Sequence, residues 1–319
     1  MGQDRANNTA GLEQAAPDEW EMKMAGLPMD QREGWIWFDG QMVPWKDAKV
    51  HVLTHGLHYA STVFEGQRAY GGEVFELTRH SQRLIDSGKM LDFTIPYSVE
   101  EINEACRQVL ARNNLIDSYM RPVAWRGSEE LAVAGRNNKV HLAIAAWVWP
   151  SYFSVEEKLK GIRLEWSKWK RPSPETIPSA AKAAGLYMIC TLSKDAAMAN
   201  GFADALMLDY RGYVAEATGA NVFFVKGDEI HTPLPDCFLN GITRQTVIGL
   251  AKTNGYKVIE RHIQPEELSK YDECFLTGTA AELTPVSQVS EFTFKPGKAC
   301  TTLINAYTEA VMPKKVAAE

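Results

Sequence analysis

The sequence predicts an α+β protein of two domains, and three observations support this fold class. The chain has 319 residues, which is more than one domain of ordinary size. Strand and helix patterns are mixed along it without a regular βαβ repeat, which argues against a doubly wound parallel sheet. Between Pro150 and Pro178 the chain is rich in Pro, Ser and Lys, and such a stretch is typical of a domain junction.

These observations predict the limits of the domains. We expect a mobile N-terminal extension at 1–33, because it mixes Asn, Gln, Ala and Gly with scattered charges and shows little periodicity. A small N-terminal domain follows at 34–150, with order beginning at Gly34. A connection at 151–180 contains the first strand of the next domain, and a larger C-terminal domain occupies 181–319.

In the N-terminal half, local patterns predict the elements in order. Two short strands should flank an Asp39-Gly40 turn, because this dipeptide is a common hairpin turn. A helix is predicted over 78–91 and a clearer one over 98–113, where Ser98 and Glu101 form a capping box. Strands are expected at 119–126 and 140–148, with a loop at 127–138 between them.

The C-terminal half continues with a strand at 162–166 and a helix over 183–200. After an apolar hairpin around Tyr210-Arg211-Gly212, a helix is predicted over 243–254, which Gly255 ends. An alternating strand at 257–263 and a strand at 273–276 come next. The second strand runs into a small-residue loop, TGTAAELTPV, and a last helix covers about 301–311.

Composition and charge exclude several classes of partner. The net charge is −6 and no basic cluster is present, so we expect no nucleic-acid partner. The longest apolar run, Leu142 to Trp149, is too short to span a bilayer, so we expect no membrane partner. The five cysteines are scattered without a CxxC pair, which predicts reduced thiols in a cytoplasmic protein.

Three histidines at helical spacing, His51, His55 and His58, suggest a metal site at first sight. No nearby carboxylate or cysteine completes a ligand set, and Gly56 weakens the helix. Partly buried, hydrogen-bonded histidines are more common than zinc sites of this composition. We therefore expect no metal.

The stretch from Ala203 to Thr246 carries the strongest chemical signal. Glu216 lies between apolar strands, so an acid stands where burial is expected. Gly241-Ile242-Thr243 then opens a helix, whose free N–H groups and hydroxyl suit an anion. This pair predicts a ligand with both a basic nitrogen and a phosphate. These residues alone still favour the alternative, a hairpin with a chance acid and a well-capped helix.

Together with the ordered motifs HYASTVFEG, YMRP, AAK and TGTAAE, these residues resemble the branched-chain amino-acid aminotransferases. The resemblance runs from Gly34 to about Val289. It implies the pyridoxal-phosphate fold type IV, similar to D-amino-acid aminotransferase, with a small N-terminal α/β domain and a larger C-terminal domain containing a mixed barrel-like sheet. It also implies transamination between branched-chain L-amino acids and 2-oxoglutarate, giving branched 2-oxo acids and L-glutamate, by a homodimer or a higher homo-oligomer.

The resemblance assigns roles toward pyridoxal 5′-phosphate. Lys182 matches the catalytic lysine that condenses with the cofactor aldehyde and then moves the substrate proton. Glu216 matches the acid that faces the pyridine nitrogen, and Tyr187 the tyrosine that hydrogen-bonds the phenolic oxygen. The phosphate is expected to be held by Arg83, Ile242, Thr243 and Thr279.

On the substrate side, the resemblance assigns an apolar pocket to Tyr59, Phe64, Trp149 and Tyr187. Arg121, with the hydroxyls of Tyr59 and Tyr152, would bind the distal carboxylate of glutamate. The α-carboxylate would meet Tyr119 and the N–H groups around Thr279 and Ala280. The loop at 127–138 is the expected contribution of a partner subunit to the pocket.

Three departures from the family pattern accompany this assignment. Ala220 stands where a second glutamate often supports the phosphate arginine, so we expect Arg83 to be held differently, for example by water. Gln67 replaces a commoner aliphatic residue, and AAGLYMICTLSK lacks the usual Asn after the lysine.

Two other functions remain open. A D-amino-acid or (R)-amine aminotransferase, or an aminodeoxychorismate lyase, would use the same fold, although the YMRP motif argues against them. A non-enzymatic scaffold would be supported only by Ala220.

Overall fold

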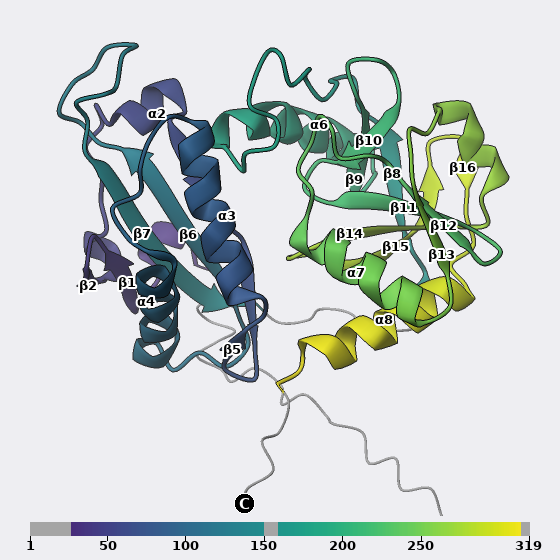
Figure 1. The fold of residues 1–319 in the computed structure, drawn as a ribbon, viewed down its shortest axis with the longest axis horizontal. Coiled ribbons are helices and arrows are strands. Elements are labelled where there is room, and N and C mark those ends of the chain that lie inside the picture. The colour runs from purple at the N-terminus through teal and green to yellow at the C-terminus, as the bar shows by residue number, and fades with distance from the viewer. Residues whose placement is uncertain (1–26, 150–158, 314–319) are drawn as a thin grey trace, which may run out of the picture.

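A computed structural model describes residues 27–149 and 159–313, which form two lobes that lie side by side (Figure 1). Most of the predicted N-terminal extension, 1–26, lies outside the described residues. Its last part does not fit the expectation that order begins at Gly34. A 3₁₀ turn, η1 (Met29–Gln31), precedes that residue, and the Met29 carbonyl accepts a hydrogen bond from Trp45 Nε1 at 2.5 Å. The bulky indole of Trp45 thus fixes a segment whose own sequence lacks periodicity.

The N-terminal lobe is a seven-stranded antiparallel sheet in the order β2-β1-β7-β6-β4-β5, with β3 beside β6. Three α-helices and a second 3₁₀ turn accompany it. The bounds are β1 Trp35–Phe38, β2 Gln41–Pro44, η2 Trp45–Asp47, α2 His55–Tyr59, β3 Thr62–Phe64, β4 Gln67–Tyr70, β5 Glu73–Val74, α3 Leu77–Met90, α4 Val99–Arg112, β6 Ser118–Arg126 and β7 Val140–Val148.

Local sequence signals explain the clearest of these elements. Asp39 and Gly40 have φ values of 46° and 90°, and two positive φ angles in succession are what a tight two-residue hairpin requires. At the start of α4, the Ser98 hydroxyl accepts from the Glu101 N–H, and the Glu101 carboxylate accepts from the Ser98 N–H. Both predictions, the hairpin and the capping box, are confirmed.

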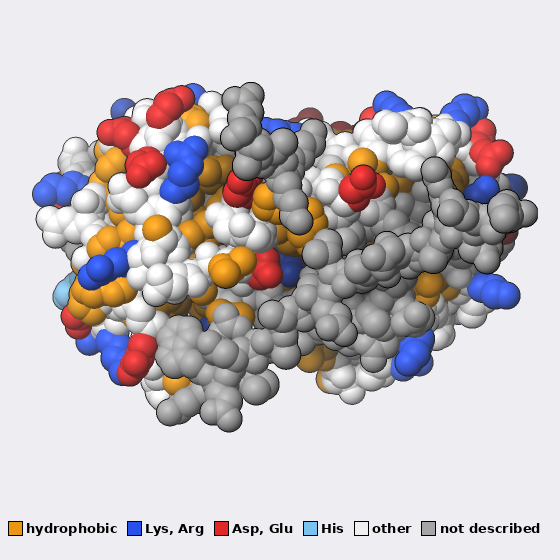
Figure 2. Space-filling view, turned by 90° about the horizontal axis from the view of Figure 1, so that it is seen from below, with side chains coloured by type: hydrophobic (Ala, Val, Ile, Leu, Met, Phe, Trp, Pro, Cys, Tyr) orange, Lys and Arg blue, Asp and Glu red, His pale blue; other side chains and the backbone are white. Residues whose placement is uncertain are grey.

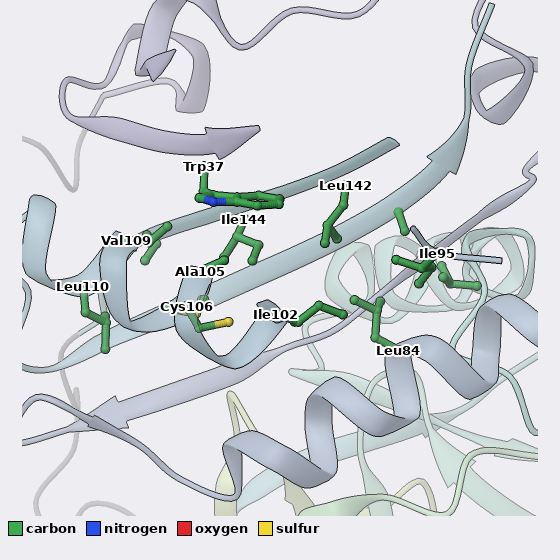
Figure 3. Packing of buried hydrophobic residues seen from close by; sticks show 14 of the residues in the cluster. Trp37, Leu84, Ile95, Ile102, Ala105, Cys106, Val109, Leu110, Leu142 and Ile144 are labelled. Atoms are coloured by element: carbon green, nitrogen blue, oxygen red, sulfur yellow. The ribbon is translucent and has the colours of Figure 1, made fainter. Parts of the chain in front are cut away.

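The core of this lobe lies between the sheet and helices α3 and α4 (Figure 3). Leu84 and Ile102 of the helices and Ile144 of β7 are fully buried in it. Ala181, Ala183 and Leu186, from far along the chain, belong to the same cluster. The segment that carries Lys182 is therefore packed against the N-terminal lobe and is held there by buried apolar surface.

The C-terminal lobe contains a nine-stranded sheet, of which β10, β9, β8, β15, β14 and β11 close into a ring through the pairing of β11 with β10. Strand β8 runs parallel to both of its neighbours, β9 and β15, whereas β14 is antiparallel to β11 and β15. This closed sheet of mixed direction confirms the predicted barrel-like domain and, with the other lobe, the two-domain α+β fold. The limits predicted for the domains stay a prediction.

The remaining bounds follow in chain order. They are β8 Ile162–Trp166, η3 Ala184–Tyr187, α6 Met188–Ala199, β9 Asp204–Leu208, β10 Val214–Ala217, β11 Asn221–Lys226, β12 Glu229–Thr232, α7 Ile242–Thr253, β13 Lys257–Glu260, η4 Pro265–Lys270, β14 Glu273–Gly278, β15 Glu282–Val289, β16 Phe292–Thr293 and α8 Lys298–Val311. Along the described part of the chain, no helix has the length and apolar character that a membrane span needs. On the face shown in Figure 2, acidic and basic side chains are interspersed.

Two predicted boundaries in this lobe were wrong. The segment TGTAAELTPV is not all loop, because only residues 279–281 lie outside strands and β15 begins at Glu282. Its pairing with β14, for example Leu283 with Thr277, supplies the ladder that the sequence did not reveal. The strand expected at 257–263 ends at Glu260, because its neighbour β12 ends at Thr232, the residue paired with Glu260.

Candidate active site

Lys182 lies where the two lobes meet and its backbone is fixed by both β3 and α3. Its carbonyl accepts from the Phe64 N–H at 3.1 Å, and its N–H donates to the Ser87 hydroxyl at 3.0 Å. The side chain is half-buried, and Nζ lies 2.7 Å from the Tyr187 hydroxyl. The Phe64 ring centroid is 4.9 Å from Nζ. The Tyr187 hydroxyl and the Phe64 ring thus restrict the orientation of the Lys182 amine.

Lys182 lines a cavity, and Glu216 of β10 lines it from the C-terminal lobe. Only 9% of Glu216 is exposed. Its Oε1 lies 3.3 Å from Arg171 Nε, and its Oε2 accepts from Asn221 Nδ2 at 3.1 Å. Asn221 also accepts from the Gly241 N–H at 3.2 Å, so one amide joins the acid to the start of α7. The buried acid predicted from the sequence is therefore present and held from two sides.

The environment of Glu216 balances its two protonation states. Burial raises the pKa of Glu216 to about 7, while the positive charges of Arg171, Lys182 and Arg244 lower it. A carboxyl group with such a pKa changes charge near neutral pH. It is suited to hold a proton shared with a basic nitrogen, which is the task expected of it.

The anion end of the cavity is built from the start of α7 and from residues around it. Helix α7 begins at Ile242, directly after Gly241, as predicted, and the first N–H groups of a helix have no acceptor within it. Thr279 follows β14, and Arg83 reaches in from α3. The cavity is lined by Arg83, Arg171, Ala181, Lys182, Leu186, Tyr187, Cys190, Glu216, Thr218, Gly219, Ala220, Asn221, Leu239, Gly241, Ile242, Thr243, Thr277, Gly278 and Thr279. All seven residues predicted to bind the cofactor are among them.

Arg83 is held differently from the family pattern, as expected, and its partner is a carboxylate from another part of the chain. Glu65, between β3 and β4, accepts from Arg83 Nε at 2.6 Å and from Nη2 at 2.8 Å. The sequence offered a signal for this contact, because Glu65 follows an apolar pair in VFEG and precedes a glycine. What the sequence lacked was the packing of α3 that brings Arg83 to it.

On the substrate side, four of the predicted residues form a continuous group next to Lys182. Phe64 packs edge-on against Tyr187, with centroids 4.8 Å apart, and the Arg121 guanidinium lies 4.8 Å from the Phe64 ring. Arg121 Nη2 donates to the Tyr119 hydroxyl at 3.0 Å, which confirms that these residues share a face of β6. The Tyr119 ring lies 5.4 Å from that of Trp149.

The other three predicted substrate residues are placed differently. Tyr59 of α2 is 45% exposed, and its ring lies against His55 and His58. Ala280 is exposed in the turn between β14 and β15. Tyr152 lies outside the described residues. The roles of all three stay predictions.

The three histidines are engaged in hydrogen bonds rather than facing one another. His55 is buried and contacts the Ser61 hydroxyl and the Ala132 carbonyl. His58 Nε2 contacts the Val52 carbonyl, and His51 Nδ1 accepts from the Leu53 N–H. Only His55 matches the expectation of burial, because His51 and His58 are exposed.

Two residues of the site, Arg171 and Asn221, were missed by sequence reasoning. Arg171 is 4% exposed, although it stands in a polar segment that resembles a surface linker. It donates from Nη1 to the Leu186 carbonyl and to Cys190 Sγ, behind the lysine segment. No local pattern distinguishes a buried arginine of this kind from a solvated one.

The donor set matches a small ligand that carries a basic ring nitrogen at one end and a phosphate at the other. Arg83 Nη1 and Thr277 Oγ1 are buried without a hydrogen-bond partner among the described residues. Together with the free N–H groups of α7, these donors suit a dianion. Glu216 suits the ring nitrogen, and Lys182 provides the amine between them.

An amine, a buried acid and an anion-binding helix start around one cavity define an aminotransferase-like site on this fold. The model of the family described as amino-transferase class IV matches residues 62–289. The chain belongs to the class IV aminotransferases.

Individual relatives agree with this assignment. The chain is 43% identical over 267 residues to the branched-chain-amino-acid aminotransferase of Pseudomonas aeruginosa, covering 82% of this chain and 87% of the relative. Among solved structures, the T.th. branched-chain amino acid aminotransferase with pyridoxamine 5′-phosphate is 40% identical. It has a TM-score of 0.86 and covers 88% of this chain and 95% of that one. The same enzyme complexed with N-(5′-phosphopyridoxyl)-L-glutamate has a TM-score of 0.83 at 40% identity, over 88% and 94% of the two chains.

Proposed function

We propose that this chain is a branched-chain amino-acid aminotransferase that uses pyridoxal 5′-phosphate. It exchanges an amino group between Leu, Ile or Val and 2-oxoglutarate, giving branched 2-oxo acids and L-glutamate. The observation that carries the proposal is that Lys182, Glu216 and the start of α7 line one cavity. The relatives described above, named for this activity and in one case bound to a glutamate adduct, support it.

Each end of the cavity has a separate task. Arg83, Thr243 and Thr279, with the N–H groups of α7, hold the phosphate. Tyr187 orients the Lys182 amine through the 2.7 Å contact and donates to the phenolic oxygen of the cofactor. The cofactor, when bound, supplies the electron sink that makes the substrate α-proton acidic.

Proton movement then depends on two side chains. With the cofactor bound, Lys182 Nζ would take the proton from the substrate α-carbon and deliver it to the cofactor, acting as base and then as acid. Glu216 would keep a proton on the ring nitrogen, and the positive charge of Arg171 favours the ionised form of Glu216 that this requires. Both groups are fixed by neighbours before any ligand arrives, so little reorganisation is required.

The substrate pocket must accept an aliphatic and an acidic side chain in turn. Phe64, Trp149 and Tyr187 provide apolar surface for the branched chain, with Tyr59 and Tyr152 completing the pocket. Arg121 binds the distal carboxylate of glutamate, because its Nε is buried without a partner among the described residues. Its contacts with Tyr119 and Phe64 shield the charge when leucine is bound. Tyr119 and the N–H groups around Thr279 and Ala280 bind the α-carboxylate.

The activity is tested with a Lys182→Ala variant, assayed for glutamate formed from leucine and 2-oxoglutarate. Lys252→Ala, which removes an exposed lysine near the end of α7, is the matched control. We expect no measurable glutamate from Lys182→Ala and an unchanged rate from the control. Undiminished turnover by Lys182→Ala would exclude the assignment. Turnover of D-alanine but not L-leucine by the wild-type protein would instead favour the alternative aminotransferases of opposite handedness.

We also propose that the protein works as a homodimer, or a higher homo-oligomer, in the cytoplasm. The segment 50–59 and the loop 127–138 are linked by the contact of His55 with the Ala132 carbonyl. Both carry exposed apolar side chains: Val50, Val52, Leu53, Leu57, Tyr59, Leu131 and Val133, of which Val133 is 84% exposed. Exposed apolar side chains of this number suit a contact with a second copy of the chain. The buried free cysteines agree with a reducing compartment.

The oligomer is tested by light scattering of Leu57→Glu and Val133→Glu variants. We expect both to be monomeric and to lose most activity, because the 127–138 loop completes the pocket of the partner. Variants that remain dimeric with full activity would contradict this arrangement.

A further inference from the structure

The contact between Glu65 and Arg83 is a largely buried ion pair beside the cavity. Glu65 has no exposed surface, and the two nitrogens of Arg83 on one side of the guanidinium fork donate to its two oxygens. The third nitrogen, Nη1, has no hydrogen-bond partner among the described residues. Arg83 also lines the cavity. A planar guanidinium that is clamped along one edge has its remaining edge fixed in direction.

A second residue of α3 supports the clamp. His80 Nδ1 lies 2.7 Å from Glu65 Oε2, and the Gly66 N–H donates to the same oxygen at 3.3 Å. Burial lowers the pKa of His80 despite the pull of Glu65, so the imidazole is neutral and donates a hydrogen. Burial alone would raise the pKa of Glu65, but Arg83 and His80 hold it well below its usual range. The clamp is thus one anion and one cation with a neutral donor.

Position 220, where a glutamate would be another possible partner for Arg83, carries no charge. Ala220 lines the cavity with only a methyl group to offer. Within the described ranges, the only carboxylate paired with Arg83 is Glu65. The direction of the arginine therefore depends on this single acid from the loop between β3 and β4.

We propose that Glu65 is a positioning residue that orients Arg83 so that its free edge binds the cofactor phosphate. This inference rests on the proposed function. Glu65 acts through Arg83, to which it is hydrogen-bonded. Its consequence is selective: Glu65 matters for ligands that carry the phosphate and not for the same ring without it.

The test compares the affinity of the apoprotein for pyridoxal phosphate with its affinity for pyridoxal, both followed by the absorbance of the lysine-bound aldehyde. Glu65→Gln removes the negative charge that accepts both hydrogen bonds from Arg83. We therefore expect about 10- to 100-fold weaker binding of pyridoxal phosphate. Binding of pyridoxal is expected to stay within about twofold of wild type, because Arg83 does not contact it. Glu76→Gln, which removes a half-buried partner of Arg79 at the start of α3, is the matched control and should change neither.

A double-mutant cycle separates positioning from a general structural effect. In an Arg83→Met background, Glu65→Gln should cause no further loss of pyridoxal phosphate affinity. Glu65→Asp keeps the charge but shortens the side chain, and it should show a smaller loss with the same selectivity. This milder variant gives the same test if Glu65→Gln does not fold.

The outcomes distinguish the two proposals. Equal losses for pyridoxal phosphate and pyridoxal, or no loss for either, would overturn the positioning role alone. A wild-type protein that binds no pyridoxal phosphate would overturn the proposed function, and this inference with it.

Discussion

Replacing Glu216 with Gln is expected to remove a pH-dependent part of the stability of the apoprotein. The pKa of Glu216 is about 7 in the folded protein, against 4.5 as the ordinary value. Between these values the folded state binds the proton more tightly than the unfolded state. The free energy of unfolding therefore rises as the pH falls through this window.

The size of the effect follows from the two pKa values. Proton linkage gives about 2.5 kcal/mol more stability at about pH 5 than at about pH 8 from this one group. A glutamine of the same shape does not titrate, so the variant lacks that increment. Because all other titrating groups remain, the difference between the two proteins isolates Glu216.

Urea unfolding of the apoproteins at the two pH values measures this difference. The gain on lowering the pH should be larger in the wild type than in Glu216→Gln, by about the amount given by linkage. Glu266→Gln, at an exposed glutamate, should follow the wild type. Equal gains in wild type and Glu216→Gln, or a smaller gain in the wild type, would refute the account of a buried acid.

Three further perturbations test other parts of the structure. Arg171→Met removes a cation that lowers the pKa of Glu216, so the gain in apoprotein stability should begin at a higher pH, which the same titration measures. Arg121→Met should raise the KM for 2-oxoglutarate about 10- to 100-fold and alter the leucine half-reaction much less, as steady-state kinetics would show. Ser98→Ala breaks the capping box of α4 and should lower the free energy of unfolding by about 1 kcal/mol in urea denaturation.

Much of the local structure was predictable because its causes are local. The turn at Asp39-Gly40 needs two positive φ angles, and the start of α4 needs a Ser and a Glu at fixed spacing. The start of α7 after Gly241 is of the same kind. In each case neighbouring residues satisfy the backbone groups, so the pattern can be recognised without the rest of the fold.

The chemistry at Glu216 was only half predictable. Its apolar flanks indicated burial, which the structure confirms. The charge of Glu216 depends on Arg171, which comes from the segment before Lys182. Arg171 reaches Glu216 because β8 lies beside β9 in the closed sheet. Sequence spacing contains no signal for such a pair.

Neighbouring residues alone were enough to predict the hairpin, the capping box of α4, the acid between apolar strands and the helix start that suits an anion. The pairing of distant groups, Glu65 with Arg83, Arg171 with Glu216, and β15 with β14, became visible only in the folded chain. The physical reason is that caps and turns are satisfied within a few residues. Buried charges and strand edges, in contrast, need partners that only the packing of the two lobes brings within reach.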